Sequence, residues 1–158
     1  MSRAFLTRAV QFSAAHRYWR PDWDEAENRR VFGACANPHG HGHTYRLEVT
    51  VHGVVDELTG FAVDLAALDD LLQREVMLPL DHRHLNHDVA EFAPGGRIPT
   101  TENLLIWLWP RIRAGLPQGA LLHRLRLRED DTLWADFYGE GEGLDQASDP
   151  TGEVHAAH

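Results

Sequence analysis

Alternating apolar and polar residues predict two β-strands in the first third of the chain. Between residues 5 and 16 most positions of one parity are apolar, and that parity ends in His16. Residues 44–52 alternate without interruption, and His41 and His43 extend their apolar parity toward the N-terminus. Because residues i and i+2 of a strand point to the same face, we expect all three histidines on the inward side.

The segment between these strands, residues 17–40, shows no sustained period and contains prolines, glycines and mixed charges. It is expected to be a long loop with at most one helical turn. Loops of this length inside a compact domain are usually functional or disordered.

Apolar residues then recur at helical spacing in two segments. The first follows Asp64, a suitable N-cap, and is expected to end near Pro79. The second follows Thr100 or Thr101 and carries Glu102 near the positive end of the helix dipole. The two apolar stripes consist of Leu65, Leu68, Leu72, Val76, and of Leu104, Trp107, Leu108, Ile112.

Two further strands are predicted at residues 121–129 and 133–138, joined by an acidic turn. The order β, β, α, α, β, β favours an α+β domain, with a four-stranded antiparallel sheet and two helices on one face. We expect a single domain over residues 1–140. Residues 141–158 form an acidic C-terminal tail without periodicity, in which His155 and His158 could bind adventitious metal.

Composition narrows the classes of function. The chain has 158 residues, a formal net charge of −9, and no apolar run near the ~20 residues of a membrane span. The N-terminus lacks signal-peptide features, so cytoplasmic residence is expected. The negative charge argues against a broad nucleic-acid surface. All fifteen basic residues are arginine, which reflects either forked recognition of anions or a codon bias.

The three histidines form a candidate metal site. Three neutral imidazoles at about 2.0–2.1 Å from Zn²⁺ leave a fourth tetrahedral position open, as in catalytic zinc centres. His16, His41 and His43 could hold such an ion. His39 could extend the set, but Pro38 and Gly40 suggest that it lies in the loop.

Cys35, the only cysteine, precedes the histidine pair closely enough to approach a metal-bound substrate. A thiolate near Zn²⁺ could act as a general base or nucleophile. If Cys35 were instead a fourth ligand, the site would be closed and structural. An inert buried thiol is the third possibility.

Two carboxylates stand out. Asp81 next to His82 could fix the imidazole tautomer and form a proton shuttle, although a solvated loop is an alternative, as is a second metal site at His84 and His87. Glu129 shares the parity of Leu121, Leu125 and Leu127 and is costly on an apolar face unless paired. It could bind a guanidine-like edge, such as a pterin ring, unless a bulge or turn exposes it to solvent.

Together these segments resemble the 6-pyruvoyltetrahydropterin synthase and 6-carboxytetrahydropterin synthase family. The matching pieces, in order over residues 5–140, are "FSAAHR", "FGACANPHGHGHTYRLEVTVHG", "TGFAVDLAALDDLL", "LPLDHRHLN", "PTTEN" and "LRLRED". The resemblance implies a tunnelling fold (T-fold), in which sheets of trimers close into a barrel and two trimers form a homohexamer with sites at subunit boundaries. Such closure would also remove exposed sheet edges.

The resemblance also implies the roles of the site residues. The Zn²⁺ ligands would be His16, His41 and His43, and Cys35 would abstract a proton with Asp81 and His82 as its relay. Glu129 would anchor the pterin, and the pocket would be lined by Thr100 and Thr101. The implied substrate is 7,8-dihydroneopterin triphosphate, converted to 6-pyruvoyltetrahydropterin with loss of triphosphate.

Three alternatives stay open. The spacing C-x5-H-x-H is similar to the pyruvoyl branch, but pairing Cys35 with His39 and His41 gives the shorter spacing of the carboxy branch of queuosine biosynthesis. A zinc hydrolase could use the same histidines with zinc-bound water and would not need the cysteine. A non-catalytic pterin- or metal-binding oligomer is the third reading.

Overall fold

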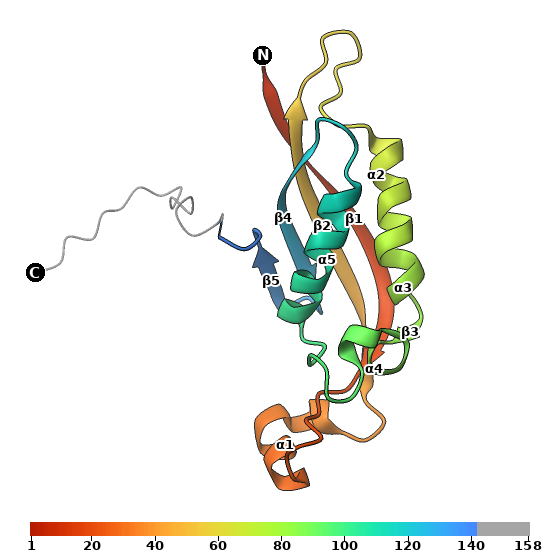
Figure 1. Ribbon diagram of the computed structural model, residues 1–158, viewed down its shortest axis with the longest axis vertical. Coiled ribbons are helices and arrows are strands. Elements are labelled where there is room, and N and C mark those ends of the chain that lie inside the picture. Colours follow the sequence, from red (N-terminus) through yellow and green to blue (C-terminus); the bar gives the residue numbers. More distant parts are fainter. Residues whose placement is uncertain (142–158) are drawn as a thin grey trace, which may run out of the picture.

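The computed structural model describes residues 1–141, which form one sheet with helices on one face (Figure 1). The strand order is β3-β1-β2-β4-β5. The strands are β1 (Arg3–His16), β2 (His41–Val54), β3 (Arg83–His84), β4 (Leu121–Arg128) and β5 (Trp134–Phe137). The long β1 and β2 are antiparallel over their whole length, and β4 and β5 continue the antiparallel order. The expected α+β class is therefore confirmed.

The sheet has five strands rather than the expected four, because the two-residue β3 pairs in parallel with β1. The chain reaches this edge where it leaves the first helical segment. There the Ser13 N–H donates to Asp81 Oδ1 at 2.9 Å, and the His82 N–H donates to the Ser13 carbonyl at 2.6 Å. So short a strand leaves no periodic pattern in a sequence.

Two helical segments cover one sheet face, as predicted (Figure 1). The first runs through α2 (Leu65–Leu72), a π-helical stretch (Gln73–Met77) and α3 (Leu78–Leu80), and Asp64 caps it by accepting from Ala67 N. The second is α5 (Thr101–Gly115). Their inward side chains and the inner sheet residues form one core. Leu65 is exposed, contrary to prediction, and Leu71 is buried instead.

The segment between β1 and β2 is more ordered than the sequence predicts. It contains α1 (Glu25–Phe32) and a 3₁₀ turn (Gly33–Ala36), which lie at the opposite end of the molecule from the N-terminus (Figure 1). Buried Asn28 connects α1 to the segment before it. Its side-chain amide donates to the carbonyls of Arg20, Trp23 and Asp24, and its Oδ1 accepts from Arg20 N. Two shorter turns, α4 (Leu85–Asp88) and a 3₁₀ turn (Ala90–Phe92), precede α5.

A β-bulge changes the predicted face of β4. The pairing with β2 shifts between Thr50 and Val51, so that Thr50 faces Arg124 while Val51 faces Leu122. Leu121 is consequently exposed and Leu122 packs against the core, contrary to the predicted parity. Beyond the bulge Leu125 and Leu127 point inward as expected.

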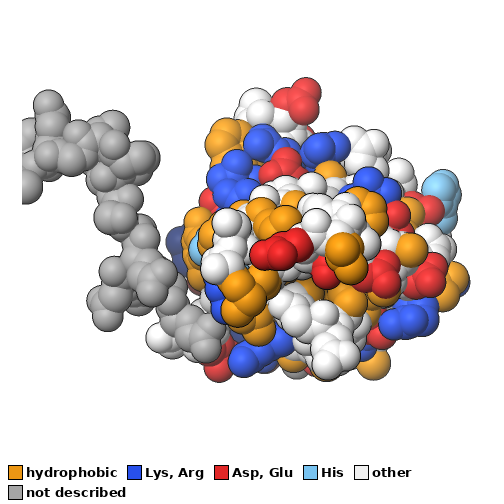
Figure 2. Space-filling view, turned by 90° about the horizontal axis from the view of Figure 1, so that it is seen from above, with side chains coloured by type: hydrophobic (Ala, Val, Ile, Leu, Met, Phe, Trp, Pro, Cys, Tyr) orange, Lys and Arg blue, Asp and Glu red, His pale blue; other side chains and the backbone are white. Residues whose placement is uncertain are grey.

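The end of the molecule that carries the N-terminus shows apolar, acidic and basic side chains interspersed (Figure 2). None of the helices in the described part of the chain is long and apolar enough to cross a membrane. The predicted acidic tail, including His155 and His158, lies outside the described residues apart from its first position.

Candidate metal centre and active site

His16, His41 and His43 meet at one end of the β1–β2 ladder. His16 and His41 are direct cross-strand partners, and His43 follows on the same face of β2. One ring nitrogen from each lies within 4.8 Å of the others, and the two Nε2 atoms of His16 and His41 are 3.2 Å apart. In the described part of the chain, this is the one group of three or more potential ligands that could hold a metal ion.

Tyr45 orients the first of these rings. Its hydroxyl lies 2.8 Å from His16 Nδ1, and neither side chain is exposed to solvent. When Nδ1 donates to this oxygen, Nε2 keeps its lone pair directed toward the other histidines, as a metal ligand requires. Burial, followed by the neighbouring His41 and His43, lowers the pKa of His16 to about 3. The ring is therefore neutral at physiological pH.

His43 provides a direct test of whether a metal fits. Its Nε2 is buried and has no hydrogen-bond partner among the described residues, although Glu129 Oε1 lies 3.1 Å away without hydrogen-bond geometry. A buried nitrogen without a partner is costly unless something else occupies its lone pair. A borderline-soft divalent cation such as Zn²⁺ matches three converging imidazole nitrogens. The residues present therefore fit a metal ion.

Cys35 lies beside the histidines. Its Sγ is 3.9 Å from His41 Nε2, and its carbonyl accepts a hydrogen bond from the Tyr18 N–H at 2.8 Å. The sulfur is not part of the three-residue group. Burial and then the charge of Glu129 raise the pKa of the thiol. Without a bound cation, the thiol is thus the favoured form.

Glu129 forms the other wall of the site and is only 7% exposed, so the possible release to solvent does not occur. The Thr101 hydroxyl donates to its Oε2 at 2.9 Å, and its Oε1 faces His43. Thr100 has a different task, because its hydroxyl accepts from Asn103 N and caps α5.

Tyr18 is a site residue that the sequence reasoning missed. Its ring centroid lies 4.6 Å from that of His16, and burial followed by Glu129 and Cys35 raises the pKa of its phenol. The available signal was its position two residues after His16, which continues the inward parity of β1.

Asp81 and His82 form the predicted pair, but at the outer edge of β1. Asp81 Oδ2 lies 2.9 Å from His82 Nδ1, while its other oxygen accepts from Ser13 N. These contacts, the backbone one first, lower the pKa of Asp81. The His82 side chain is 82% exposed and has a positive φ of 57°. The hydrogen bonds of this pair involve Ser13, whereas those of Cys35 involve His41 and Tyr18, and among the described residues no hydrogen bond or ion pair joins Asp81 or His82 to Cys35.

Three other described histidines, His39, His84 and His87, are not members of the three-histidine group. His39 is exposed, so the shorter spacing with Cys35 does not describe the site. The rings of His84 and His87 are 4.1 Å apart, but no third ligand among the described residues completes a second metal site.

A mostly antiparallel sheet with helices on one face and three inward histidines beside a thiol and a buried glutamate defines an α+β protein with a group of side chains that could hold a metal ion. The family model "6-pyruvoyl tetrahydropterin synthase" matches residues 5–140, and the chain belongs to this family.

Individual relatives support this family assignment. The 6-pyruvoyl tetrahydrobiopterin synthase of Pongo abelii is 39% identical over 87% of this chain and 93% of its own. The structure of 6-pyruvoyl tetrahydropterin synthase from Caenorhabditis elegans has a TM-score of 0.81 and 31% identity, covering 88% of this chain and 97% of that one. A dihydroneopterin monophosphate aldolase of Pyrococcus furiosus is 33% identical over 85% of this chain and 97% of its own. The fold thus occurs with more than one named activity on pterins.

Proposed function

We propose that this protein is a zinc-dependent lyase that converts 7,8-dihydroneopterin triphosphate to 6-pyruvoyltetrahydropterin with release of triphosphate. Family membership and the names of relatives such as the Pongo abelii synthase support this reaction. The observation that carries the proposal is the convergence of His16, His41 and His43 beside Cys35 and Glu129. Bound Zn²⁺ would polarise substrate oxygens and so acidify the adjacent C–H bonds.

Glu129 would recognise the pterin ring. A buried carboxylate that is held by Thr101 on one oxygen can accept hydrogen bonds from the amino-pyrimidinone edge with the other. Burial strengthens such a bond, because little water competes for the carboxylate. Thr100, which precedes Thr101 and caps α5, would contribute through its position at the start of that helix.

Cys35 would remove a proton from the substrate side chain, and His82 would return one, oriented by Asp81. The raised pKa of the thiol opposes this role until a cation lies nearby, since a positive charge stabilises the thiolate. The carboxylate of Asp81, fixed by Ser13 N, holds the ring of His82 through Nδ1 and leaves Nε2 for proton exchange.

We propose that the complete site forms between subunits, since no contact within the described part of one chain joins the Asp81–His82 pair to Cys35. The free sheet edges support this assembly. β3 covers the outer edge of β1 only at Ala14 and Ala15, and the short β5 forms the other edge. Unpaired edges favour pairing with another strand. A homohexamer made of two trimers is the assembly we propose.

The histidine geometry favours the pyruvoyl reaction over the carboxy alternative. The group uses His41 and His43, which corresponds to the C-x5-H-x-H spacing, and His39 is outside it. A hydrolase would not need the neighbouring thiol, and a non-catalytic binder would not need the Asp81–His82 pair.

Mass spectrometry of the products tests the proposal. Zinc-loaded protein incubated with 7,8-dihydroneopterin triphosphate should yield 6-pyruvoyltetrahydropterin and free triphosphate in equal amounts. A carboxy product, carbon–carbon cleavage of the aldolase type, simple hydrolysis of phosphate, or unchanged substrate would each reject it.

A further inference from the structure

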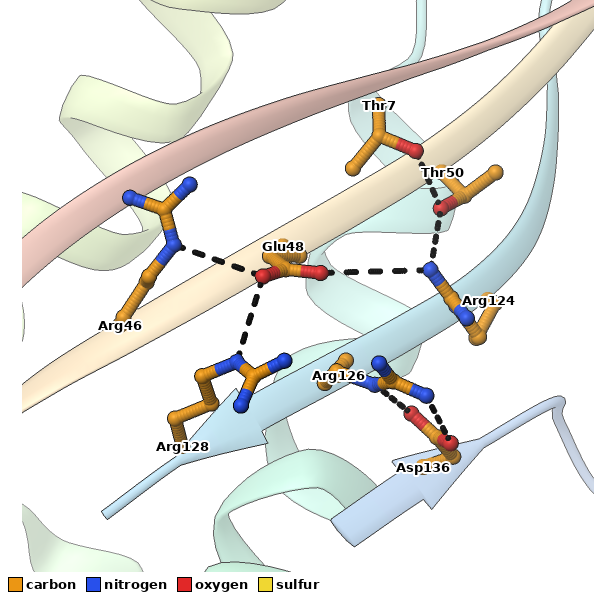
Figure 3. Close-up of polar contacts among 8 residues, drawn as sticks. All are labelled: Thr7, Arg46, Glu48, Thr50, Arg124, Arg126, Arg128 and Asp136. Atoms are coloured by element: carbon orange, nitrogen blue, oxygen red, sulfur yellow. Dashed lines mark hydrogen bonds and ion pairs between the residues drawn. The ribbon is translucent and has the colours of Figure 1, made fainter. Parts of the chain in front are cut away.

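The sheet face opposite the helices carries a cluster of arginines, the β4 arginine cluster, defined by Arg46, Arg124, Arg126 and Arg128 (Figure 3). These residues alternate along β2 and β4 with the core residues Leu47, Leu125 and Leu127, so they point away from the core. Arg46 faces Arg128 across the strands, Glu48 faces Arg126, and Thr50 faces Arg124. Four guanidinium groups are thus set on one small surface of a chain whose formal charge is −9.

One member of the cluster is well paired. Arg126 forms two parallel hydrogen bonds to Asp136, at 2.7 and 2.8 Å, and these lower the pKa of that carboxyl. This is the fork geometry that guanidinium and carboxylate groups prefer. Arg126 therefore has little capacity left for another partner.

The other three arginines share a single carboxylate. The Nε atoms of Arg46 and Arg128 each lie 3.4 Å from Glu48 Oε1, and Arg124 NH2 lies 4.0 Å from Oε2. None of these contacts reaches the about 2.7–2.9 Å of a strong charge-assisted bond. One negative charge cannot neutralise three positive ones, so an excess of two positive charges remains at this point.

Hydrogen-bond donors also remain unused. The Nε of Arg124 is buried and has no partner among the described residues. Besides its 4.0 Å contact to Glu48, its NH2 group makes a 3.4 Å contact to Thr50 Oγ1, which is itself paired with Thr7 Oγ1 at 2.8 Å. Because a guanidinium offers five N–H donors in a planar fork, Arg46, Arg124 and Arg128 together present many free donors.

We propose that the β4 arginine cluster is a binding site for an anion that carries several phosphate groups. Tetrahedral phosphate oxygens match forked guanidinium donors, and a multiply charged anion would supply the negative charge that Glu48 alone does not. The site lies on the reverse of the sheet from the histidines, because Arg46 and Arg128 alternate with the inward Tyr45 and Glu129. It is therefore distinct from the site of the proposed reaction and does not depend on it.

Calorimetric titration with inorganic triphosphate tests this site. In low-salt buffer the wild-type protein should bind triphosphate at least about tenfold more tightly than orthophosphate, and high salt should weaken the binding. The variant R46Q/R124Q should lose affinity at least about tenfold, because two guanidinium groups with free N–H donors are removed. The control Arg74→Gln removes one positive charge, as the single variant Arg46→Gln does, but from an exposed helical position, and it should bind as the wild type does.

Two results would overturn the proposal: equal affinity in R46Q/R124Q and wild type, or an equal loss in Arg74→Gln, which would indicate only a general charge effect. Single Arg46→Gln, at a half-exposed position, serves if the double variant fails to fold, and a partial loss is then expected. Parallel titrations with orthophosphate and pyrophosphate distinguish a single-phosphate site from one that needs a longer anion. Equal affinity for all three anions would reject the preference for several phosphates.

Discussion

The Tyr45 hydroxyl lies 2.8 Å from His16 Nδ1 in the interior of the protein. The contact links the core to the candidate metal centre, because the tyrosine ring also stacks on Phe12 with centroids 5.0 Å apart. A packed core therefore fixes the direction of one imidazole ligand.

Tyr45→Phe should weaken zinc binding by about tenfold, the lower end of the effect expected when a partner of a ligating histidine is removed. The fold should persist, since the phenyl ring keeps its packing on Phe12. Competition with a chromogenic chelator measures the affinity. Tyr138→Phe, at an exposed position, is the control and should bind zinc normally. Unchanged affinity in Tyr45→Phe would show that the hydroxyl does not contribute to zinc binding.

Gly40 positions the loop that leads into His41. It has a φ of +67°, and a Cβ there would lie 2.3 Å from the carbonyl oxygen of His16. Gly40→Ala should therefore lower the free energy of unfolding by at least about 2 kcal/mol and also weaken zinc binding. Gly60→Ala has a similar φ of +75° but no atom within 4 Å, so it isolates the backbone cost. If both variants bind zinc equally well, the close approach at Gly40 does not shape the site.

Cys35→Ala should retain zinc but lose turnover, because the thiol lies beside the three ligands without being one of them. A loss of at least about 10²-fold in kcat is expected for the removal of a general base. Zinc content is measured on the same preparation. A variant that turns over normally contradicts the proton-transfer role, and one that loses its zinc identifies the sulfur as a ligand.

Glu129→Gln should weaken binding of the pterin, since an amide replaces a charge-assisted acceptor with a weaker one and places a donor near the ring. We expect KM to rise by at least about tenfold while zinc stays bound. Glu57→Gln, which changes an exposed carboxylate in the turn after β2, is the matched control. An equal effect in both variants would point to general charge rather than to recognition by Glu129.

Without metal, stability should depend on pH through His16. Its pKa is lowered to about 3 in the folded protein, chiefly by burial, whereas an unfolded histidine titrates near about 6.5. Between these values the unfolded chain binds a proton that the folded chain does not, so stability falls as the pH is lowered through 6.5 toward 3. The loss between pH 7.5 and pH 5 is on the order of 2 kcal/mol.

Urea denaturation in the presence of a chelator measures this loss. His16→Asn should flatten the dependence, while His39→Asn, at an exposed site, should leave it unchanged. A wild-type protein with equal stability at both pH values would contradict the neutral, buried state of His16.

Strand periodicity predicted the inward direction of His16, His41 and His43, because alternation holds along a whole strand, and the structure confirms it. The cap Asp64 was likewise predicted from local chemistry alone, and of the two candidates Thr100 and Thr101 the structure uses Thr100. Both features depend on residues near one another in the chain.

Features set by tertiary contacts were not predictable in this way. The strand β3 forms through the hydrogen bonds between Ser13 and the Asp81–His82 peptide, 68 residues apart. The bulge opposite Thr50 reversed the face of Leu121 without any turn signal. The buried amide of Asn28 connects α1 to residues 20–24, and the sequence shows it only as one more polar residue.

X-ray absorption spectroscopy of the zinc-loaded protein tests whether three histidines and no sulfur bind the metal, because the spectrum separates nitrogen from sulfur ligands. We predict one zinc per chain, with three imidazole nitrogens at about 2.0–2.1 Å and no sulfur shell. A sulfur at about 2.3 Å, or a spectrum that is unchanged when His43 is replaced by alanine, would contradict it.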